Sequence, residues 1–384
     1  MTIHANYDYI ISGSGCAGLS LLKRMMQHPF FDDKQILVID KAPKEKNDRT
    51  WCFWEQGEGV FESLVFRKWQ DVGFYSKYFS SSLPLSPYQY KMIRGIDFYQ
   101  HIQELAKQRS NIHFLYEPVL KIGTAGDKAF VETATSISTA EYVFNSILFE
   151  KPEIRKGEYM LLQHFKGWVI ETKEPAFDPD KATFMDFRVA QDEGTTFMYV
   201  LPISTNSALV EYTLFTPNLL EQEKYVKELQ AYLQNYLKID HYTIEHEEFG
   251  IIPMTNHVFP AADGRVINMG IAGGQAKGSS GYAFQFIQKK TDEILSNLVK
   301  GSYPSSRTSL TEKKFRFYDA VLLHVLYNKQ LNGDEVFAAI FKKNPAQRVL
   351  KFLDNESNLW DDLQIMNSVP TTIFLKAAIK ELFR

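Results

Sequence analysis

The segment between residues 7 and 40 constrains the fold of this chain more than any other feature of the sequence. It begins with a short aromatic and β-branched run, residues 7–12, that is typical of a buried strand. A turn follows whose three glycines have the G-x-G-x-x-G spacing: Gly13, Gly15 and Gly18. A helical pattern then runs to Pro29, and a second apolar strand ends in Asp40, at the roughly 20-residue spacing that a dinucleotide-binding unit requires.

Each part of this unit has a physical role in binding an adenine dinucleotide. The first glycine permits a tight turn, the second lets the backbone approach a pyrophosphate, and the third lets the helix pack closely on the strand. The helix N-terminus offers unpaired N–H groups to the phosphates, and Asp40 can accept a hydrogen bond from a ribose hydroxyl. The unit therefore predicts a Rossmann-like domain but leaves NAD and FAD open.

The composition sets outer limits on the function. The 384 residues suffice for two domains, and a formal net charge of −3 provides no basic surface for nucleic acid. Two cysteines form no disulfide framework, which favours a reduced, cytoplasmic compartment, and the first strand begins too early for us to expect a targeting peptide. We expect no membrane span, because no run of 18 apolar residues occurs, and no metal site, because the nine histidines lack ligand spacing.

Aromatic residues are abundant, with 29 Phe, 20 Tyr and 5 Trp. This supply exceeds what an ordinary core requires and indicates an extended apolar cavity or an apolar surface. A thick aromatic core would account for the same composition.

The pattern of the chain changes in a way that predicts four segments. Residues 1–160 form the first part of the FAD-binding domain, and residues 161–245 form longer alternating strands with one helix, an inserted sheet-based substrate domain. Residues 246–300 return to the FAD-binding domain, and residues 301–384 form a C-terminal helical region. The predicted fold class is α/β: an FAD-binding Rossmann-like domain with an inserted β-sheet domain and C-terminal helices.

The returning segment contains a second glycine-rich loop, residues 270–282, in front of a predicted helix. A glycine turn before a helix N-terminus can contact another part of the same cofactor. A flavin needs such a closing element for its ring and ribityl chain, so this loop favours FAD, with contacts from Gly273, Gly274 and Gly281. No second G-x-G-x-x-G follows a strand, so we expect no separate nicotinamide site.

Several motifs occur together in one order along the chain. They are Gly13 to Gly18 with Asp40, Arg49-Thr50-Trp51, Met185-Asp186-Phe187, Leu201-Pro202, Leu209 to Thr213, Gly250 to Met254, and Gly278 to Tyr282. In this combination the chain resembles the bacterial lycopene β-cyclases, flavoproteins of carotenoid synthesis. The last loop departs from that family, because Lys277 to Tyr282 stands where relatives often have His-Pro before Thr-Gly-Tyr, and this leaves the contacts of the flavin ring open.

The resemblance implies a cyclisation without net redox change. An acid protonates the terminal double bond of lycopene or another linear carotenoid, and the neighbouring double bond closes a six-membered β-ionone ring. The products implied are γ-carotene and then β-carotene. The resemblance further implies FAD in its reduced form, with electrons from NAD(P)H or a donor protein.

Glu211 is the predicted proton donor. A carbon–carbon double bond is a poor base, so the acid must stay protonated near neutral pH, and burial can raise a carboxyl pKa by up to ~3–5 units. Glu211 lies between apolar and aromatic residues on a predicted strand, inside the motif that matches the catalytic carboxylate of the family. The alternative for a glutamate on a half-exposed strand is a solvent-facing side chain.

Other site residues follow from the matched motifs. Asp186 is a second candidate catalytic carboxylate, and its alternative is a structural acid paired with Arg188. Arg49 and Arg94 are candidate phosphate or flavin contacts, and an ordinary surface arginine is the alternative for Arg94. One charge ~4 Å from the carbocation is worth about 4 kcal/mol at an effective dielectric of 20, against about 0.5–2 kcal/mol for one aromatic ring. The candidate substrate-binding aromatics are Trp51, Trp54, Phe187 and Tyr212.

A C40 polyene does not dissolve in water, so we expect the protein to dock on the inner face of the cell membrane as a peripheral protein. The candidate docking helix is residues 334–343, which places Val336, Phe337, Ile340 and Phe341 on one side. Packing of that helix on the core is the alternative, and the last helix, residues 371–383, is equally ambiguous.

Two other classes of function remain open. One is a flavin oxidoreductase of the same fold, either a monooxygenase or an isoprenoid reductase, and the other is a non-catalytic flavin or carotenoid carrier. The mass of the product discriminates between the enzymes, since a cyclase leaves it unchanged, a hydroxylase adds oxygen and a reductase adds hydrogen.

Overall fold

The structure, a computed structural model, describes residues 3–305 and 308–383. Its first layer is a six-stranded sheet in the order β19-β20-β13-β2-β3-β9, in which every pairing except β19–β20 is parallel. The strands are β2 (Tyr9–Ser12), β3 (Ile36–Asp40), β9 (Ile112–Tyr116), β13 (Tyr142–Asn145), β19 (Ala262–Asp263) and β20 (Val266–Asn268). β2, β3 and β13 are buried along their whole length, as expected of parallel strands covered on both faces.

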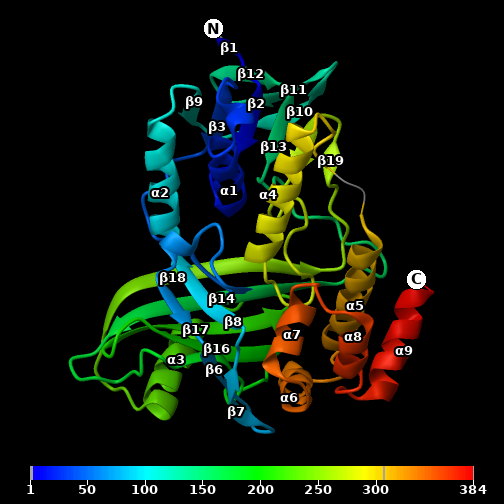
Figure 1. The fold of residues 1–384 in the computed structure, drawn as a ribbon. Coiled ribbons are helices and arrows are strands. Elements are labelled where there is room, and N and C mark those ends of the chain that lie inside the picture. The colour runs from blue at the N-terminus through cyan, green and yellow to red at the C-terminus, as the bar shows by residue number, and fades with distance from the viewer. Residues whose placement is uncertain (1–2, 306–307, 384) are drawn as a thin grey trace.

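The two faces of this sheet are covered differently. Three helices share a core with one face: α1 (Cys16–Met26), α2 (Gly95–Lys107) and α4 (Phe284–Val299). The other face packs on a four-stranded sheet in the order β1-β12-β11-β10. Its strands are β1 (Ile3–Asn6), β10 (Lys121–Ala125), β11 (Lys128–Glu132) and β12 (Ser136–Ala140). This three-layer unit forms the upper half of the molecule in Figure 1.

The lower half is built on a seven-stranded sheet in the order β18-β14-β17-β16-β15-β6-β7, antiparallel except for the β15–β6 pair. The strands are β6 (Asp71–Tyr75), β7 (Ser80–Pro84), β14 (Met160–Glu171), β15 (Ala182–Asp186), β16 (Thr195–Pro202), β17 (Ser207–Thr216) and β18 (Thr243–Thr255). A small sheet in the order β4-β8-β5 shares a hydrophobic core with the seven-stranded sheet, to which it contributes Trp54, Trp69 and Tyr90. Its strands are β4 (Thr50–Gln56), β5 (Arg67–Trp69) and β8 (Tyr88–Arg94).

Helices cover both faces of the seven-stranded sheet. One face packs against α3 (Gln222–Tyr232), which continues as a π-helical turn over Leu233–Leu237. The other face shares a core with C-terminal helices. These are α5 (Leu310–Tyr327), α6 (Gly333–Lys343), α7 (Ala346–Leu353), α8 (Leu359–Met366) and α9 (Thr371–Leu382), at the lower right of Figure 1. Short 3-10 turns occur at Pro29–Phe31 and Glu62–Leu64.

The predicted fold class is confirmed, but the sheet-based segment is larger than residues 161–245. β6 and β7 come from residues 71–84, because β6 pairs in parallel with β15, and β18 continues to Thr255. Such long-range pairing leaves no local mark in the sequence, so the boundaries could not be drawn from pattern alone.

Helix α6 differs from its predicted role. Its four apolar residues, Val336, Phe337, Ile340 and Phe341, are buried in the core beneath the seven-stranded sheet. The expectation that this helix docks on a membrane is therefore wrong, and the core-packing alternative is correct. Over the described ranges, 3–305 and 308–383, no helix is long and apolar enough to span a bilayer.

Candidate active site between the two sheets

A cavity of about 390 Å³ lies where the glycine turn of the first sheet faces the seven-stranded sheet. The first sheet contributes loops to its wall, among them Gly15, Ser146 and Gly270. The second sheet contributes side chains from β14, β16, β17 and β18, including Gln163, Tyr199, Glu211 and Glu248. The cavity thus brings together residues that are far apart in the sequence, from Gly15 to Ile287.

The glycine turn has the geometry that a dinucleotide needs. Gly13 has a φ of +97°, and a Cβ there would lie 2.3 Å from Oγ of Ser146. A Cβ on Gly18 would lie 2.0 Å from the carbonyl oxygen of Gly13, so this position requires glycine for helix packing. A Cβ on Gly15 would meet no atom within 4 Å. Because Gly15 lines the cavity at the N-terminus of α1, the open space beside it suits a pyrophosphate.

Asp40 and Arg49 lie near this turn. Oδ2 of Asp40 accepts hydrogen bonds from the backbone N–H (2.7 Å) and the hydroxyl (2.8 Å) of Ser14, which places the carboxylate beside the glycine turn at the end of β3. Arg49 lines the cavity, and its Nη1 donates to the carbonyl oxygens of Asp48 (2.8 Å) and Phe249 (3.0 Å). Their contacts with a nucleotide stay predictions.

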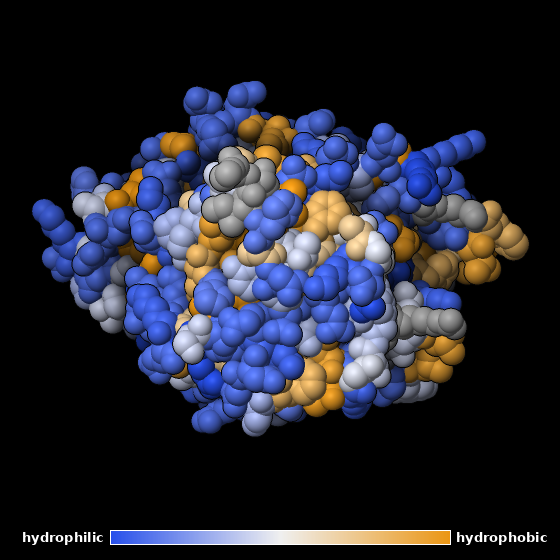
Figure 2. All heavy atoms as spheres, turned by 90° about the horizontal axis from the view of Figure 1, so that it is seen from above, coloured by the Kyte–Doolittle hydropathy of each residue, from blue (hydrophilic) through white to orange (hydrophobic). Residues whose placement is uncertain are grey.

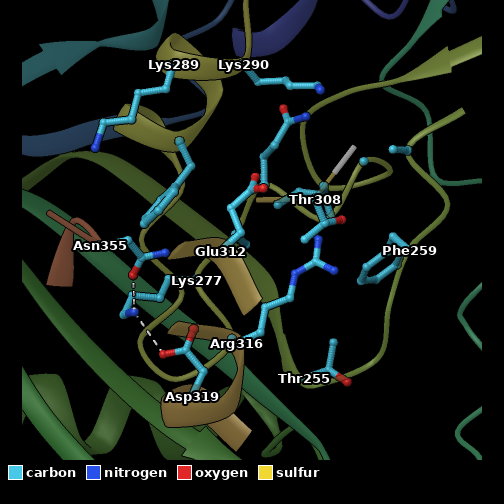
Figure 3. Close-up of a pocket in the computed structure, with 18 of the residues that line it drawn as sticks. Thr255, Phe259, Lys277, Lys289, Lys290, Thr308, Glu312, Arg316, Asp319 and Asn355 are labelled. Carbon is cyan, nitrogen blue, oxygen red and sulfur yellow. Dashed lines mark hydrogen bonds and ion pairs between the residues drawn. The ribbon is translucent and has the colours of Figure 1, made fainter. Parts of the chain in front are cut away.

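The second glycine loop faces two cavities. Gly281 lines the central cavity, whereas Gly273 and Gly274 line a separate cavity of about 330 Å³ between α4 and α5. Figure 3 shows Glu312 and Arg316 of α5 pointing into that second cavity. The structure therefore does not bring Gly273 and Gly274 to the predicted flavin site. Gly273 is required for packing instead, since a Cβ there would lie 2.5 Å from the carbonyl oxygen of Asn268.

A buried ion pair forms part of the wall of the second cavity. Nζ of Lys277 lies 2.8 Å from Oδ1 of Asp319 and donates to Oδ1 of Asn355 at 2.7 Å, as drawn in Figure 3. Lys277 belongs to the loop in which the sequence departs from the family, and its side chain is fully buried. Among the described residues, no group of three or more His, Cys, Asp or Glu side chains could hold a metal ion.

Glu211 lies in the central cavity, as its strand position predicts. Side chains alternate across β17, and Leu209 and Glu211 both line the cavity, while Val210 and Tyr212 face the core under α3. Oε1 of Glu211 accepts a hydrogen bond from Oγ1 of Thr213 at 2.8 Å. Desolvation of the carboxyl group raises the pKa of Glu211 well above the ordinary value of a glutamate, and the charge of Glu248 raises it further.

Glu248 is a cavity residue that the sequence analysis missed. It is 5% exposed on β18, accepts a hydrogen bond from Oγ1 of Thr50 at 2.8 Å, and lines the same cavity as Glu211. Burial also raises the pKa of Glu248, while the bond from Thr50 and the charge of Arg49 act in the opposite direction. Burial of two neighbouring carboxyl groups therefore raises the pKa of both and disfavours their simultaneous ionisation.

The sequence around Glu248 explains why it was missed. It stands in the charged run from Glu245 to Glu248, which looks like a solvated strand end. The available signal was its position two residues before Gly250, the first residue of a matched motif, because residues at i and i+2 of a strand share a face.

Aromatic side chains form part of the cavity wall. Trp51, Tyr90, Tyr199 and Tyr282 line it, and the hydroxyls of Tyr199 and Tyr282 lie 3.3 Å apart. Trp54 stands behind Tyr282, with ring centroids 4.7 Å apart in an edge arrangement, and does not line the cavity itself. Of the predicted substrate-binding aromatics, only Trp51 reaches this space directly.

Three predicted site residues lie elsewhere. Asp186 is fully buried, with its carboxylate accepting hydrogen bonds from Nε of Arg188 (2.9 Å) and the hydroxyl of Tyr232 (2.8 Å), so the alternative of a structural acid describes its contacts. Phe187 packs against Phe337 at 5.8 Å between ring centroids, in the core under α6. Tyr212 faces α3 because strand alternation directs it away from Glu211.

Arg94 also lies outside the cavity. Its guanidinium group forms an ion pair with Asp97 in the first turn of α2, at 2.6 Å from Nε to Oδ2. Arg94 immediately precedes α2, and Asp97 lies in the first turn of that helix. The pairing is therefore local and needs no ligand.

Comparison with known proteins identifies a family for this chain. The family description "Lycopene cyclase protein" matches residues 8–379 of the chain. The chain is 31% identical over 129 residues to the lycopene beta cyclase, chloroplastic/chromoplastic, of Narcissus pseudonarcissus, a match that spans 30% of this chain and only 25% of that protein.

Solved structures show a similar fold over nearly the whole chain. A flavoprotein/dehydrogenase from Cytophaga hutchinsonii has a TM-score of 0.62 and 13% identity, covering 98% of this chain and 99% of that one. A geranylgeranyl bacteriochlorophyll reductase-like protein from Thermoplasma acidophilum has a TM-score of 0.60 and 12% identity, covering 99% and 96%. At these identities the likeness concerns the fold, whereas the match over residues 8–379 concerns the family. The chain belongs to the lycopene cyclase family.

Proposed function

We propose that the protein is an FAD-dependent lycopene β-cyclase, which converts the linear ends of lycopene into β-ionone rings without net redox change. The observation that carries this proposal is the position of Glu211 in an aromatic-walled cavity, where desolvation raises the pKa of its carboxyl group well above the ordinary value of a glutamate. An acid of this kind can protonate an alkene, which ordinary surface carboxylates cannot do near neutral pH.

Four features of the cavity fit FAD. Gly15 leaves open space at the N-terminus of α1 for the pyrophosphate, and Arg49 adds a positive charge nearby. Gly281 has a φ of +71° and lines the same cavity, so its backbone can approach a ring closely. Oε1 of Gln163 is buried in this wall and has no hydrogen-bond partner within the described parts of the chain, as expected of a group that a ligand satisfies. Reduced FAD held there would supply negative charge beside the reacting end of the polyene.

Residues of the cavity account for the first proton transfer and for stabilisation of the resulting cation. Glu211 transfers its proton to the terminal double bond of the substrate, which leaves a tertiary carbocation on the polyene. The neighbouring double bond attacks this cation and closes a six-membered ring, and loss of one ring proton restores neutrality. The ring of Trp51 and those of the cavity tyrosines can each stabilise the cation by about 0.5–2 kcal/mol. One proton enters and one leaves, so no electrons are consumed.

The pair with Glu248 has a second consequence for this chemistry. After transfer, Glu211 would be a carboxylate next to another buried carboxylate, which is unfavourable in a cavity of low dielectric. The raised pKa of Glu211 therefore favours the protonated form that can donate to the alkene and lets the residue regain a proton readily before the next ring is closed, whereas stabilisation of the carbocation has to drive the transfer itself.

Isotope labelling tests the proposal directly. With the FAD-loaded protein, a reductant and detergent-dispersed lycopene in D₂O, we expect each closed ring to carry one deuterium, while the product made in H₂O has the mass of the substrate. Addition of one oxygen would identify a monooxygenase, and addition of two hydrogens would identify an isoprenoid reductase. Either result contradicts the cyclase proposal.

Substitution of Glu211 tests its role as the proton donor, with a second buried carboxylate as the control. We expect Glu211→Gln to lower cyclisation on the order of 100- to 10,000-fold, with the bound flavin and the unfolding temperature retained. Asp186→Asn serves as the control, because breaking its buried ion pair should cost about 2–4 kcal/mol of unfolding free energy but leave turnover of the folded protein unchanged. Full cyclisation activity of Glu211→Gln would show that another acid is the proton donor.

A further inference from the structure

The two last helices expose an unusual amount of apolar side chain. Six residues define what we call the α8–α9 apolar face, and each is between 49% and 69% exposed: Leu359, Trp360 and Leu363 on α8, and Leu375, Ile379 and Leu382 on α9. Figure 1 shows both helices at one side of the molecule, and Figure 2 shows hydrophobic residues at that same right-hand edge. Single exposed apolar residues are common, but a gathering on consecutive helices indicates a contact surface.

Both helices are fixed to the same helix of the core. Asp362 of α8 accepts a hydrogen bond from Nζ of Lys314 on α5 at 2.7 Å. Glu381 of α9 lies 3.0 Å from Nδ1 of His324 on α5 and accepts a hydrogen bond from the hydroxyl of Tyr159 at 2.8 Å. These buried polar contacts hold α8 and α9 on α5, so their outward sides form a fixed platform.

The acidic side chains of α8 and α9 face the protein, whereas the lysines of α9 face solvent. Their carboxylates point inward: the side chains of Asp362 and Glu381 are 1% and 2% exposed, and that of Asp361 is 16% exposed and paired with Arg348. The two lysines of α9, at positions 376 and 380, are exposed. The outward side of α9 is therefore apolar and positive. It complements a partner surface that has an apolar interior and negatively charged groups at its boundary with water.

The lysines also have the right place around the helix. At about 100° per residue, Leu375, Ile379 and Leu382 fall within an arc of roughly 60°, and Lys376 and Lys380 follow along one border of it. Lysine stems can lie along apolar surface while the ammonium groups reach outward to phosphates. An exposed tryptophan on α8 fits the same boundary, since its ring is apolar and its N–H is polar.

We propose that the α8–α9 apolar face docks the protein on the surface of an anionic lipid bilayer. The inference rests in one respect on the proposed function, namely that the substrate is a polyene that has to be taken up from lipid. Its other grounds are the exposed side chains, their fixed support and the one-sided charge. A docked helix of this kind buries its apolar side about 5–10 Å into the headgroup boundary without crossing the bilayer.

Vesicle binding tests the proposal without substrate or flavin. We expect the full-length protein to sediment with vesicles of phosphatidylglycerol and phosphatidylcholine, and less with phosphatidylcholine alone. The variant Leu375→Ser/Ile379→Ser/Leu382→Ser should bind at least about tenfold more weakly to both. Lys376→Gln/Lys380→Gln should weaken binding to the anionic vesicles only and reduce its salt dependence.

The chain provides a matched control. Leu120, Leu219 and Val258 are 60%, 45% and 61% exposed in other parts of the molecule, so Leu120→Ser/Leu219→Ser/Val258→Ser removes comparable apolar surface and should leave binding unchanged. All these positions are exposed, and unfolding temperatures should stay close to that of the unmodified protein.

Trp360 gives an independent measurement. Trp54, Trp69 and Trp168 are at most 2% exposed, whereas Trp360 is 66% exposed. Vesicles should shift the fluorescence emission to shorter wavelength, and Trp360→Phe should abolish most of that shift.

Three outcomes would overturn the proposal: no vesicle binding by the unmodified protein, equal binding by the triple variant, or equal loss in the control variant. A concentration-dependent dimer that the triple variant abolishes while vesicle binding persists would assign the face to a second copy of the chain. Cyclisation of detergent-dispersed lycopene is measured separately, so failure of docking and failure of the proposed activity are distinguishable.

Discussion

At the scale of single residues, the environment of Glu211 decides its chemistry more than its identity does. A glutamate on a half-exposed strand is ordinarily ionised and solvated. Here the carboxyl group lies in the cavity beside a second buried carboxyl group, and both neighbours of Glu211 along β17 face the opposite core. The protonated form follows from desolvation and from the charge of Glu248.

The partnership of the two glutamates can be tested through pH. Glu211 is active when protonated, so activity should fall as the pH rises through its pKa. Glu248→Gln removes a like charge, which lowers the pKa of Glu211, so the alkaline limb of kcat/KM should move to lower pH. The position of this limb is measured with detergent-dispersed lycopene.

The adjacent residue supplies the control for that experiment. Glu247 lies on the same strand, its side chain is 52% exposed, and it pairs with Lys166. Glu247→Gln should leave the pH profile in place. An alkaline limb that stays fixed or moves upward in Glu248→Gln would show that the two carboxyl groups are not coupled.

At the scale of elements, two glycines of the turn between β2 and α1 serve different purposes: the space at Gly15 suits a ligand, whereas Gly18 is needed for packing. Gly15→Ala has room for its methyl group, so the flavin-free protein should unfold at nearly the same temperature. The methyl group would occupy the space that suits a pyrophosphate, and FAD affinity should fall at least about tenfold. Gly18→Ala places a Cβ against the carbonyl of Gly13, and overpacking there should cost about 1–3 kcal/mol of unfolding free energy.

Two measurements on each variant distinguish these effects. Flavin titration followed by absorbance gives the affinity, and denaturant unfolding without flavin gives the stability. A loss of stability in Gly15→Ala equal to that in Gly18→Ala would contradict the assignment of Gly15 to ligand binding.

At the scale of the whole molecule, the cavity joins two sheets that have separate cores. Its wall combines the glycine turn of the first sheet with β14, β16, β17 and β18 of the second. A flavin bound there contacts both halves, so we expect FAD to raise the unfolding temperature of the molecule as one transition. At 100 times the dissociation constant the gain is about 2.7 kcal/mol, or about 3 °C for a chain of this length.

Scanning calorimetry with and without FAD measures this shift. Stabilisation of only one of two separate transitions would place the cofactor within a single half of the molecule. That result would leave Glu211 on the second sheet without a cofactor beside it, and the proposed reaction would lose its geometric basis.

The sequence by itself determined the features that depend on near neighbours in the chain. The glycine turn, its strands and helix, and the alternation that directs Leu209 and Glu211 to one face all follow from residues within a few positions of each other. Local steric rules and strand periodicity fix these directly, which is why the fold class and the place of Glu211 were predictable.

Only the tertiary structure decided which face of each element meets the cavity. Asp186 and Tyr212 stand in matched motifs, yet α3 covers their side of the sheet. Glu248 stands in a charged run, yet it is buried in the cavity wall beside Thr50 of β4. Helices α6 and α9 are both amphipathic, but one is buried and the other exposed. Periodicity tells which residues share a face, whereas the partner of that face is set by packing between segments far apart in sequence.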